Sequence, residues 1–135
     1  MEECPYCEIV AGESDAYILT DTGSTVAFLD RNPASTGHTL VVPKRHCGFL
    51  FQGDDPSSRP VFETIERLVE AMNLTLQPDG ISTFYTSGPL VGSVSHAHVH
   101  LIPRYEDDTI RLSLTRNRLE DRDGEELARQ LRKSL

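Results

Sequence analysis

The sequence lacks the features that mark secreted and membrane proteins. Its 135 residues include only three cysteines and no tryptophan, and three cysteines cannot form a complete disulfide framework. No apolar run approaches the roughly 20 residues that cross a bilayer. Residues 1–10 lack the basic start and apolar core of an export signal. We therefore expect a cytoplasmic protein that contacts no membrane.

Positive charge is also scarce. Lys44 and Lys133 are the only lysines, and 13 basic residues stand against 21 acidic residues, which gives a formal net charge of -8. A surface of this sign repels the phosphates of nucleic acids. The sequence therefore predicts a protein that binds no nucleic acid. An anionic small substrate would need a local positive or dipolar pocket.

Turn-forming residues divide the chain into short segments of strand character, without repeats or an interdomain linker. Residues 16–30 indicate two short strands around a turn at 21–23. Residues 38–43 and 81–86 indicate two further strands, because β-branched residues are concentrated in both. This pattern favours a single domain with a mainly antiparallel sheet.

Two segments have helical periodicity. After a break at residues 53–60, an apolar stripe predicts one long helix, with members Phe62, Ile65, Leu68, Val69, Met72 and Leu76. After Asp121, a short polar helix is expected to turn Leu127 and Leu131 inward. Strands and helices alternate too little for a doubly wound sheet, so the class is α+β with one long helix and a short C-terminal helix.

Three of the five histidines alternate in the segment "HAHVHLIPR", at residues 96, 98 and 100. In a strand, this spacing places all three imidazoles on one face and turns Ala97 and Val99 to the other. Three interpretations compete. The segment is a polar strand face, a three-histidine metal centre, or a site in which one histidine is a nucleophile and the others have separate tasks. The outer rings of a flat strand lie about 13 Å apart, which disfavours a single shared metal.

The cysteines suggest metal binding more than disulfide formation. Cys4 and Cys7 form a C-x-x-C pair, which in a reducing compartment indicates a metal site or a redox couple. The redox interpretation lacks the strand–helix context of thioredoxin-like proteins. Cys47 is expected to be a buried free cysteine.

Three motifs resemble the histidine-triad (HIT) family. "HAHVHLIPR" is similar to the family's His-x-His-x-His signature, "VAFLDRNPASTGHTLVVPKRH" (residues 26–46) to its first half, and "CPYCEIVAGE" to its zinc-bearing N-terminal variant. The sequence of these motifs is most similar to the Hint-like branch of small bacterial and archaeal members. The resemblance implies a single HIT-like domain over residues 1–135, with the core motifs in 4–104 and a C-terminal extension in 105–135.

The resemblance also implies an activity. Family members are nucleotidyl hydrolases or transferases that cleave at the α-phosphate of purine nucleotide conjugates, such as nucleoside phosphoramidates or dinucleoside polyphosphates. His98 matches the nucleophile, which forms a nucleotidyl-histidine that water then hydrolyses. Neutral imidazole suits this step. His100 would donate to the phosphate, His38 would orient the site, and Ser93 would hold the leaving-group side.

The nucleotide pocket follows from the same comparison. Asp30 matches the carboxylate that accepts from the ribose hydroxyls, while Phe28, Leu40 and Tyr6 match residues that line the nucleotide site. Each has a plainer interpretation. Asp30 is also a natural turn residue, Phe28 and Leu40 are also natural core residues, and His38 is also a natural strand-edge histidine.

The resemblance assigns a structural zinc to four residues, Cys4, Cys7, His46 and His96. A Cys₂His₂ set is a closed tetrahedral site. It would tie the N-terminus to the histidine segment and leave His38, His98 and His100 for chemistry. The family also implies a homodimer.

The chain departs from the family pattern in the phosphate loop. Thr86 and Ser87 stand where the family has asparagine, and the loop is one residue short, between Gly92 and Ser93. Two alternatives stay open, and the altered loop motivates the first of them. One is a nucleotide-binding sensor or scaffold with little turnover, and the other is a hydrolase in which zinc is the working ion.

Overall fold

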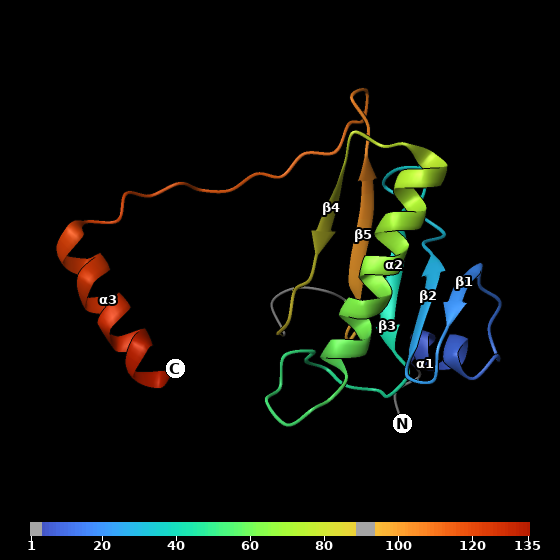
Figure 1. Cartoon of the computed structure of the whole chain (residues 1–135), viewed down its shortest axis with the longest axis horizontal. Coiled ribbons are helices and arrows are strands. Elements are labelled where there is room, and N and C mark those ends of the chain that lie inside the picture. The colour runs from blue at the N-terminus through green and yellow to red at the C-terminus, as the bar shows by residue number, and fades with distance from the viewer. Residues whose placement is uncertain (1–3, 89–93) are drawn as a thin grey trace.

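The computed structural model describes residues 4–88 and 94–135 and contains five strands and three helices. The elements in chain order are α1 (Pro5–Val10), β1 (Ile18–Asp21), β2 (Thr25–Leu29), β3 (Thr39–Pro43), α2 (Ser58–Leu76), β4 (Gly80–Phe84), β5 (Val99–Arg104) and α3 (Asp121–Ser134). The strands form one antiparallel sheet in the order β1-β2-β3-β5-β4 (Figure 1). The α+β prediction with an antiparallel sheet is confirmed.

The two faces of the sheet are buried by different helices. Alternate residues of the central strands, among them Ala27, Val41 and Leu101, pack with α2 in one core. Their neighbours Phe28 and Leu40 face the opposite way and pack with α1 in a second core. This division follows from the two-residue side-chain period of a strand. The sheet is therefore a thin wall, with α2 on one side and α1 on the other.

The long helix buries a stripe that shares Ile65, Leu68 and Met72 with the predicted stripe, while Val69 and Leu76 are only partly buried. The buried residues of α2 are Val61, Thr64, Ile65, Leu68 and Met72. Phe62, which the sequence interpretation turned inward, is 43% exposed and stacks on Phe51, with 5.8 Å between ring centroids. A helix rotates by about 100° per residue, so Val61 and Phe62 cannot both point into the core, and the smaller residue takes the inward position.

The C-terminal helix forms where it was expected, but its apolar side is not buried. Leu127 and Leu131 are 49% and 59% exposed, so the prediction that they turn inward is wrong. In Figure 1, α3 stands away from the sheet at the end of a long extended segment. Within residues 4–88 and 94–135, no helix combines the length and apolarity that a bilayer crossing requires.

Replacing Leu101 by alanine should be strongly destabilising. Leu101 is fully buried between the sheet and α2, and a buried Leu→Ala change loses about 2–5 kcal/mol. Leu74→Ala is the matched control, because Leu74 lies on α2 but is 76% exposed. We expect the control to change the free energy of unfolding in urea by less than about 0.5 kcal/mol. Equal effects of the two substitutions would contradict this description of the core.

Candidate functional site

The histidine segment keeps its alternation but is only partly a strand. β5 begins at Val99, so of the three alternating histidines only His100 lies within it, and His96 sits at a bend. The expectation that all three project from one strand is therefore corrected. From Ala97 onward burial alternates as expected, with Ala97 and Val99 in the core beneath α2, but His96 is itself fully buried. The bend frees the ring of His96 from the row formed by the other two.

The geometry selects one tautomer of His98. Its Nδ1 lies 2.8 Å from the backbone carbonyl oxygen of His96. A carbonyl can only accept, so Nδ1 carries the hydrogen and donates. The neutral ring therefore keeps its lone pair on Nε2, the atom farthest from the backbone. The His98 ring also packs against Tyr6 and His100, with 5.1 Å between ring centroids in each case. This lone pair makes Nε2 of His98 a candidate nucleophile.

His38 and His100 form a directed pair. The backbone N–H of Ala34 donates to Nδ1 of His38 at 3.0 Å, so the hydrogen of the neutral His38 ring is on Nε2. That Nε2–H points to Nδ1 of His100 at 2.9 Å. His100 must accept there, and in its neutral form it carries its own hydrogen on Nε2. The backbone amide of Ala34 thus makes Nε2 of His100 a hydrogen-bond donor, whereas Nε2 of His98 carries a lone pair.

Asp30 lies next to His38 of this pair. Its Oδ1 accepts from the backbone N–H of Asn32 at 2.8 Å, which is the turn function anticipated as the plainer interpretation. Its Oδ2 lies 3.5 Å from Nε2 of His38. Burial lowers the pKa of His38, and the nearby carboxylate only partly opposes this shift. Burial also lowers the pKa of His100, with help from the neighbouring rings. Both rings are therefore neutral near pH 7.

A glycine fixes the approach to His38. Gly37 has φ +94°, a conformation that side chains disfavour. A Cβ there would lie 2.5 Å from Leu76 Cδ1 and 3.0 Å from Pro103 Cγ. Only glycine lets the chain pass the end of α2 at this point. His38 then enters the site directly before β3 and is 6% exposed.

The four residues assigned to metal binding converge at the N-terminal side of the histidine segment. Nδ1 of His96 lies 3.5 Å from the Sγ of Cys4 and 3.5 Å from that of Cys7, and Nδ1 of His46 lies 3.2 Å from Cys7 Sγ. All four ligand atoms lie within 4.8 Å of one another. These residues come from positions as distant as 4 and 96, so the fold brings together a cluster that could hold a metal.

The spacing of this cluster suits a tetrahedral cation. Bonds of 2.3 Å to sulfur and 2.0–2.1 Å to nitrogen place tetrahedral S and N ligands about 3.6 Å apart, close to the observed separations. Nε2 of His96 donates to the carbonyl oxygen of Pro43 at 2.7 Å. Its Nδ1 is therefore unprotonated, faces the sulfurs and can ligate a metal. The hydrogen bond from Nε2 to a backbone carbonyl is the one that metal-bound histidines usually make. Burial and the neighbouring Cys4 raise the pKa of the Cys7 thiol, an effect that a bound cation reverses.

Tyr6 connects the cluster with the histidines. It lies on α1 between the two cysteines, and its ring centroid is 5.7 Å from that of Phe28 and 5.9 Å from that of His96. Phe28 and Leu40 are cross-strand neighbours and are 3% and 5% exposed. Their burial agrees with the core interpretation. Tyr6 packs against both Phe28 and His98, and Leu40 is the cross-strand partner of His100, so these apolar residues border the histidines.

Some assigned positions add little to this geometry. Ser93 lies outside the described residues. Cys47 is a free, buried cysteine of the α2 core, as expected. The groups missed by sequence reasoning are backbone atoms, namely the carbonyls of His96 and Pro43 and the amide of Ala34. Because every residue has such atoms, residue types carried no signal for them.

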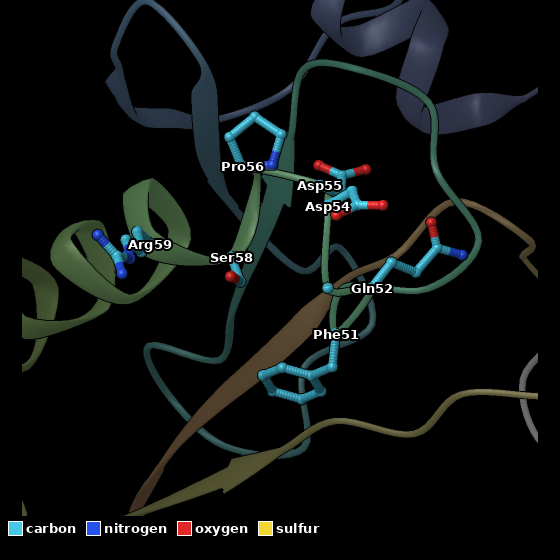
Figure 2. Close-up of a pocket in the computed structure, with 8 residues that line it drawn as sticks. Phe51, Gln52, Asp54, Asp55, Pro56, Ser58 and Arg59 are labelled. Atoms are coloured by element: carbon cyan, nitrogen blue, oxygen red, sulfur yellow. The ribbon is translucent and has the colours of Figure 1, made fainter. Parts of the chain in front are cut away.

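A separate hollow of about 640 Å³ lies in the loop before α2 (Figure 2). It is lined by Phe51, Gln52, Gly53, Asp54, Asp55, Pro56, Ser58 and Arg59. It contains no histidine or cysteine, and two carboxylates on its wall disfavour a phosphate ligand. The chemistry-bearing residues therefore lie elsewhere, on the opposite side of the sheet from α2.

Comparison with known proteins points to one family. The model of the HIT domain matches residues 11–107. The chain is 33% identical over 105 residues to "Protein hit" of Bacillus subtilis, covering 77% of this chain and 72% of that protein. It is 29% identical over 106 residues to adenosine 5'-monophosphoramidase hnt1 of Schizosaccharomyces pombe, covering 78% and 77%.

Solved structures agree with this match. A crystal structure of a HIT family member from Bacillus subtilis has a TM-score of 0.90 and 28% identity, covering 99% of this chain and 98% of that one. A Zn-bound histidine triad family protein from Mycobacterium smegmatis has a TM-score of 0.72 and 27% identity, covering 98% and 97%. The first superposition includes the C-terminal helix.

The hydrogen bonds of the site predict opposite tautomers for two adjacent histidines. We expect the neutral form of His98 to carry its proton on Nδ1 and that of His100 on Nε2, because their Nδ1 atoms face a carbonyl and an N–H donor respectively. Two-bond ¹H–¹⁵N correlation spectra of the imidazoles distinguish these forms. Each ring is a control for the other, and identical tautomers would contradict the assigned geometry.

Proposed function

The chain belongs to the HIT domain family, and on that premise we propose that it is a nucleotidyl hydrolase or transferase acting at the α-phosphate of purine nucleotide conjugates. The observation that carries the proposal is the hydrogen bond from Nδ1 of His98 to the His96 carbonyl, which leaves the lone pair of the neutral ring on Nε2. The name of the fission-yeast relative, an adenosine 5'-monophosphoramidase, supports nucleoside phosphoramidates as substrates.

The proposed reaction has two steps. Nε2 of His98 attacks the α-phosphorus, the bond to the leaving group breaks, and that group departs with the bonding electrons and takes up a proton. Water then attacks the same phosphorus, the bond to Nε2 breaks, and the nucleoside monophosphate leaves. Neutral imidazole leaves readily from the phosphorylated imidazolium, so the intermediate divides one difficult substitution into two easier ones.

His100 would act on the phosphate oxygens, with His38 behind it. Because His100 accepts from His38 through Nδ1, its Nε2–H is free to donate to a non-bridging or bridging oxygen. An N–H aimed where charge develops stabilises the transition state more than the ground state. His38 would be a positioning residue, held by Ala34 and backed by Asp30.

The remaining assignments complete the proposed pocket. Oδ2 of Asp30, whose other oxygen is engaged in the turn, would accept from the ribose hydroxyls. Phe28, Leu40 and Tyr6 would line the nucleotide site, and Ser93 would contact the leaving-group side. We also propose that the protein works as a homodimer.

We infer that the cluster of Cys4, Cys7, His46 and His96 holds a structural zinc. The fit of the ligand separations to a tetrahedron and the hydrogen bond from His96 to Pro43 support this inference. When bound, zinc would supply a cross-link between the N-terminal helix and the histidine segment. With four protein ligands the site is closed, which disfavours a working ion. Thiol ligands suit a reducing compartment, in keeping with a cytoplasmic protein.

A second candidate function rests on the phosphate loop. Thr86 and Ser87 replace the expected asparagine, and the loop is one residue short. Fewer contacts to the leaving group would slow turnover but leave nucleotide binding in place. A sensor or scaffold that binds nucleotide without releasing product quickly is therefore the alternative.

The test of the main proposal is hydrolysis of an AMP–amine phosphoramidate. We expect the wild-type protein to release AMP and His98→Asn to lose at least about a thousandfold in kcat/KM, as nucleophile removal does in other enzymes. Intact mass spectrometry of the quenched wild type should detect an adenylyl adduct on His98. AMP binding measured by calorimetry should survive the substitution. Binding without turnover in the wild type would select the sensor instead, and unchanged turnover in His98→Asn would overturn the nucleophile.

The metal proposal has its own test. We expect one zinc per chain by elemental analysis, and less than a tenth of that in the Cys4→Ala/Cys7→Ala double variant. Cys47→Ala is the matched control, because this free cysteine lies outside the cluster, and it should retain the metal. Chelation should lower the Tm, since metal binding is coupled to folding. Full zinc content in the double variant would overturn the site, and chelation that abolishes turnover without moving the Tm would support a working ion.

A further inference from the structure

Helix α1 is anchored to the domain through two cysteines. In the described part of the chain, every hydrogen-bond contact from α1 and its N-terminal cap to a residue beyond Ser14 is made by Cys4 or Cys7. These contacts end on His46 and His96, while the other hydrogen bonds of the helix are local. The apolar side chains of α1 are only partly buried. The cysteine–histidine cluster is therefore the polar anchor of this helix.

The same anchor holds a residue of the nucleotide site. Tyr6 lies between the two cysteines in the sequence, and its ring packs on His98 and on Phe28, with 5.1 Å and 5.7 Å between ring centroids. A helix of six residues is too short to be stable alone. Tyr6 therefore keeps its position only while α1 is held. A change that breaks the cluster also removes Tyr6 from the proposed nucleotide site.

The two anchoring cysteines are placed to react with each other. Their sulfurs belong to a group of ligand atoms that all lie within 4.8 Å of one another. Both cysteines are free and only partly buried, whereas Cys47 is buried in the α2 core. The backbone N–H of Cys7 donates to Sγ of Cys4 at 3.4 Å, so both thiols lie on one turn of the chain. A disulfide between them would require no movement of the sheet.

A disulfide and the four-ligand metal site exclude each other. The metal site requires both sulfurs as thiolates, and the sulfurs of a disulfide carry no negative charge. Oxidation would leave only the two histidines of the ligand set. His96 would keep its hydrogen bond to the carbonyl of Pro43. The histidine segment would consequently stay in place, while α1 would lose its anchor.

We propose that Cys4 and Cys7 form a redox switch, whose oxidation by a hydroperoxide releases the zinc and detaches α1 from the nucleotide site. This inference rests on the structural zinc and the nucleotide site proposed above, and it adds a control that neither includes. A catalyst of disulfide exchange would need the strand–helix context that the sequence lacks. A switch needs only the loss of two ligands.

The oxidation has two steps. One thiolate attacks the peroxide, the O–O bond breaks, and hydroxide leaves and takes up a proton, which gives a sulfenic acid and water. The second thiolate attacks the sulfenic sulfur, the S–O bond breaks, and hydroxide again leaves and becomes water. In sum, two thiolates are oxidised to one disulfide, the peroxide is reduced to two waters, and the solvent supplies two protons.

The test treats the zinc-loaded full-length chain with hydrogen peroxide. We expect mass spectrometry to show a disulfide between Cys4 and Cys7, together with zinc release measured by a colorimetric chelator. Amide hydrogens of α1 should then exchange at least about tenfold faster. AMP should bind at least about tenfold more weakly by calorimetry, because the ring of Tyr6 leaves the site. A dithiol reductant with added zinc should reverse all of these changes.

Two variants isolate the cysteine pair. Cys47→Ala should keep the full response to peroxide, because Cys47 lies outside the cluster. Cys7→His cannot form the disulfide but still offers four side chains that ligate zinc. Peroxide should therefore change the AMP affinity of Cys7→His by less than about twofold.

Each contrary result has a distinct meaning. Thiols that stay reduced would overturn the switch, and so would a disulfide that forms while zinc is retained. Zinc release that leaves the exchange of α1 and the AMP affinity unchanged would overturn it as well. A reduced protein without zinc would overturn the metal site and the switch together. Failure of the proposed function differs, because the reduced protein then binds no AMP, and zinc release with the exchange of α1 still decides the switch.

Discussion

The site depends on one hydrogen bond, from Nδ1 of His98 to the backbone carbonyl of His96 at 2.8 Å. That carbonyl is held because the His96 ring is held, by Pro43 on one side and by the cysteine sulfurs on the other. One residue thus has two separate tasks. Its ring belongs to the cysteine–histidine cluster, and its main-chain carbonyl sets the tautomer of His98. The bend at His96 makes this possible, because a continued strand would have placed its ring in the row with the others.

The proposed reaction requires an acidic protein to bind an anion, and the site offers dipoles for this purpose. Burial lowers the pKa values of His38 and His100, and at His38 this effect outweighs the attraction of Asp30. The rings are consequently neutral donors and acceptors with assigned directions. A charged ring at these positions would attract phosphate more strongly, but it would also hold the product and would leave His98 beside a repelling cation. Neutral N–H groups that are already aimed need no reorganisation when charge develops.

The sequence predicted the parts of this arrangement that depend on side-chain identity and period. The two-residue alternation predicted that Ala97 and Val99 lie in the core, and the resemblance to the HIT family predicted which cysteines and histidines converge. It failed where several solutions share one pattern. A stripe with a period of 3.6 residues admits either Val61 or Phe62 as its first member, and packing decided between them. The backbone partners at Ala34 and Pro43 were invisible, because peptide groups are common to all residues.

Each end of the chain carries a short helix that the domain does not bury, and the two helices differ in the side chains they present. Helix α1 has six residues and no buried residue of its own, and α3 has 14 residues whose apolar face the domain does not cover. Neither helix is long enough to be stable alone. The first has two thiols beside two imidazoles, and the second has a row of exposed leucines. Because small domains bury a limited fraction of their surface, binding of a metal at the N-terminal end would stabilise the fold by mass action. Amphipathicity alone predicts that Leu127 and Leu131 become buried, but it does not specify the molecule that buries them, and the assumption that it is the same chain produced the error at α3.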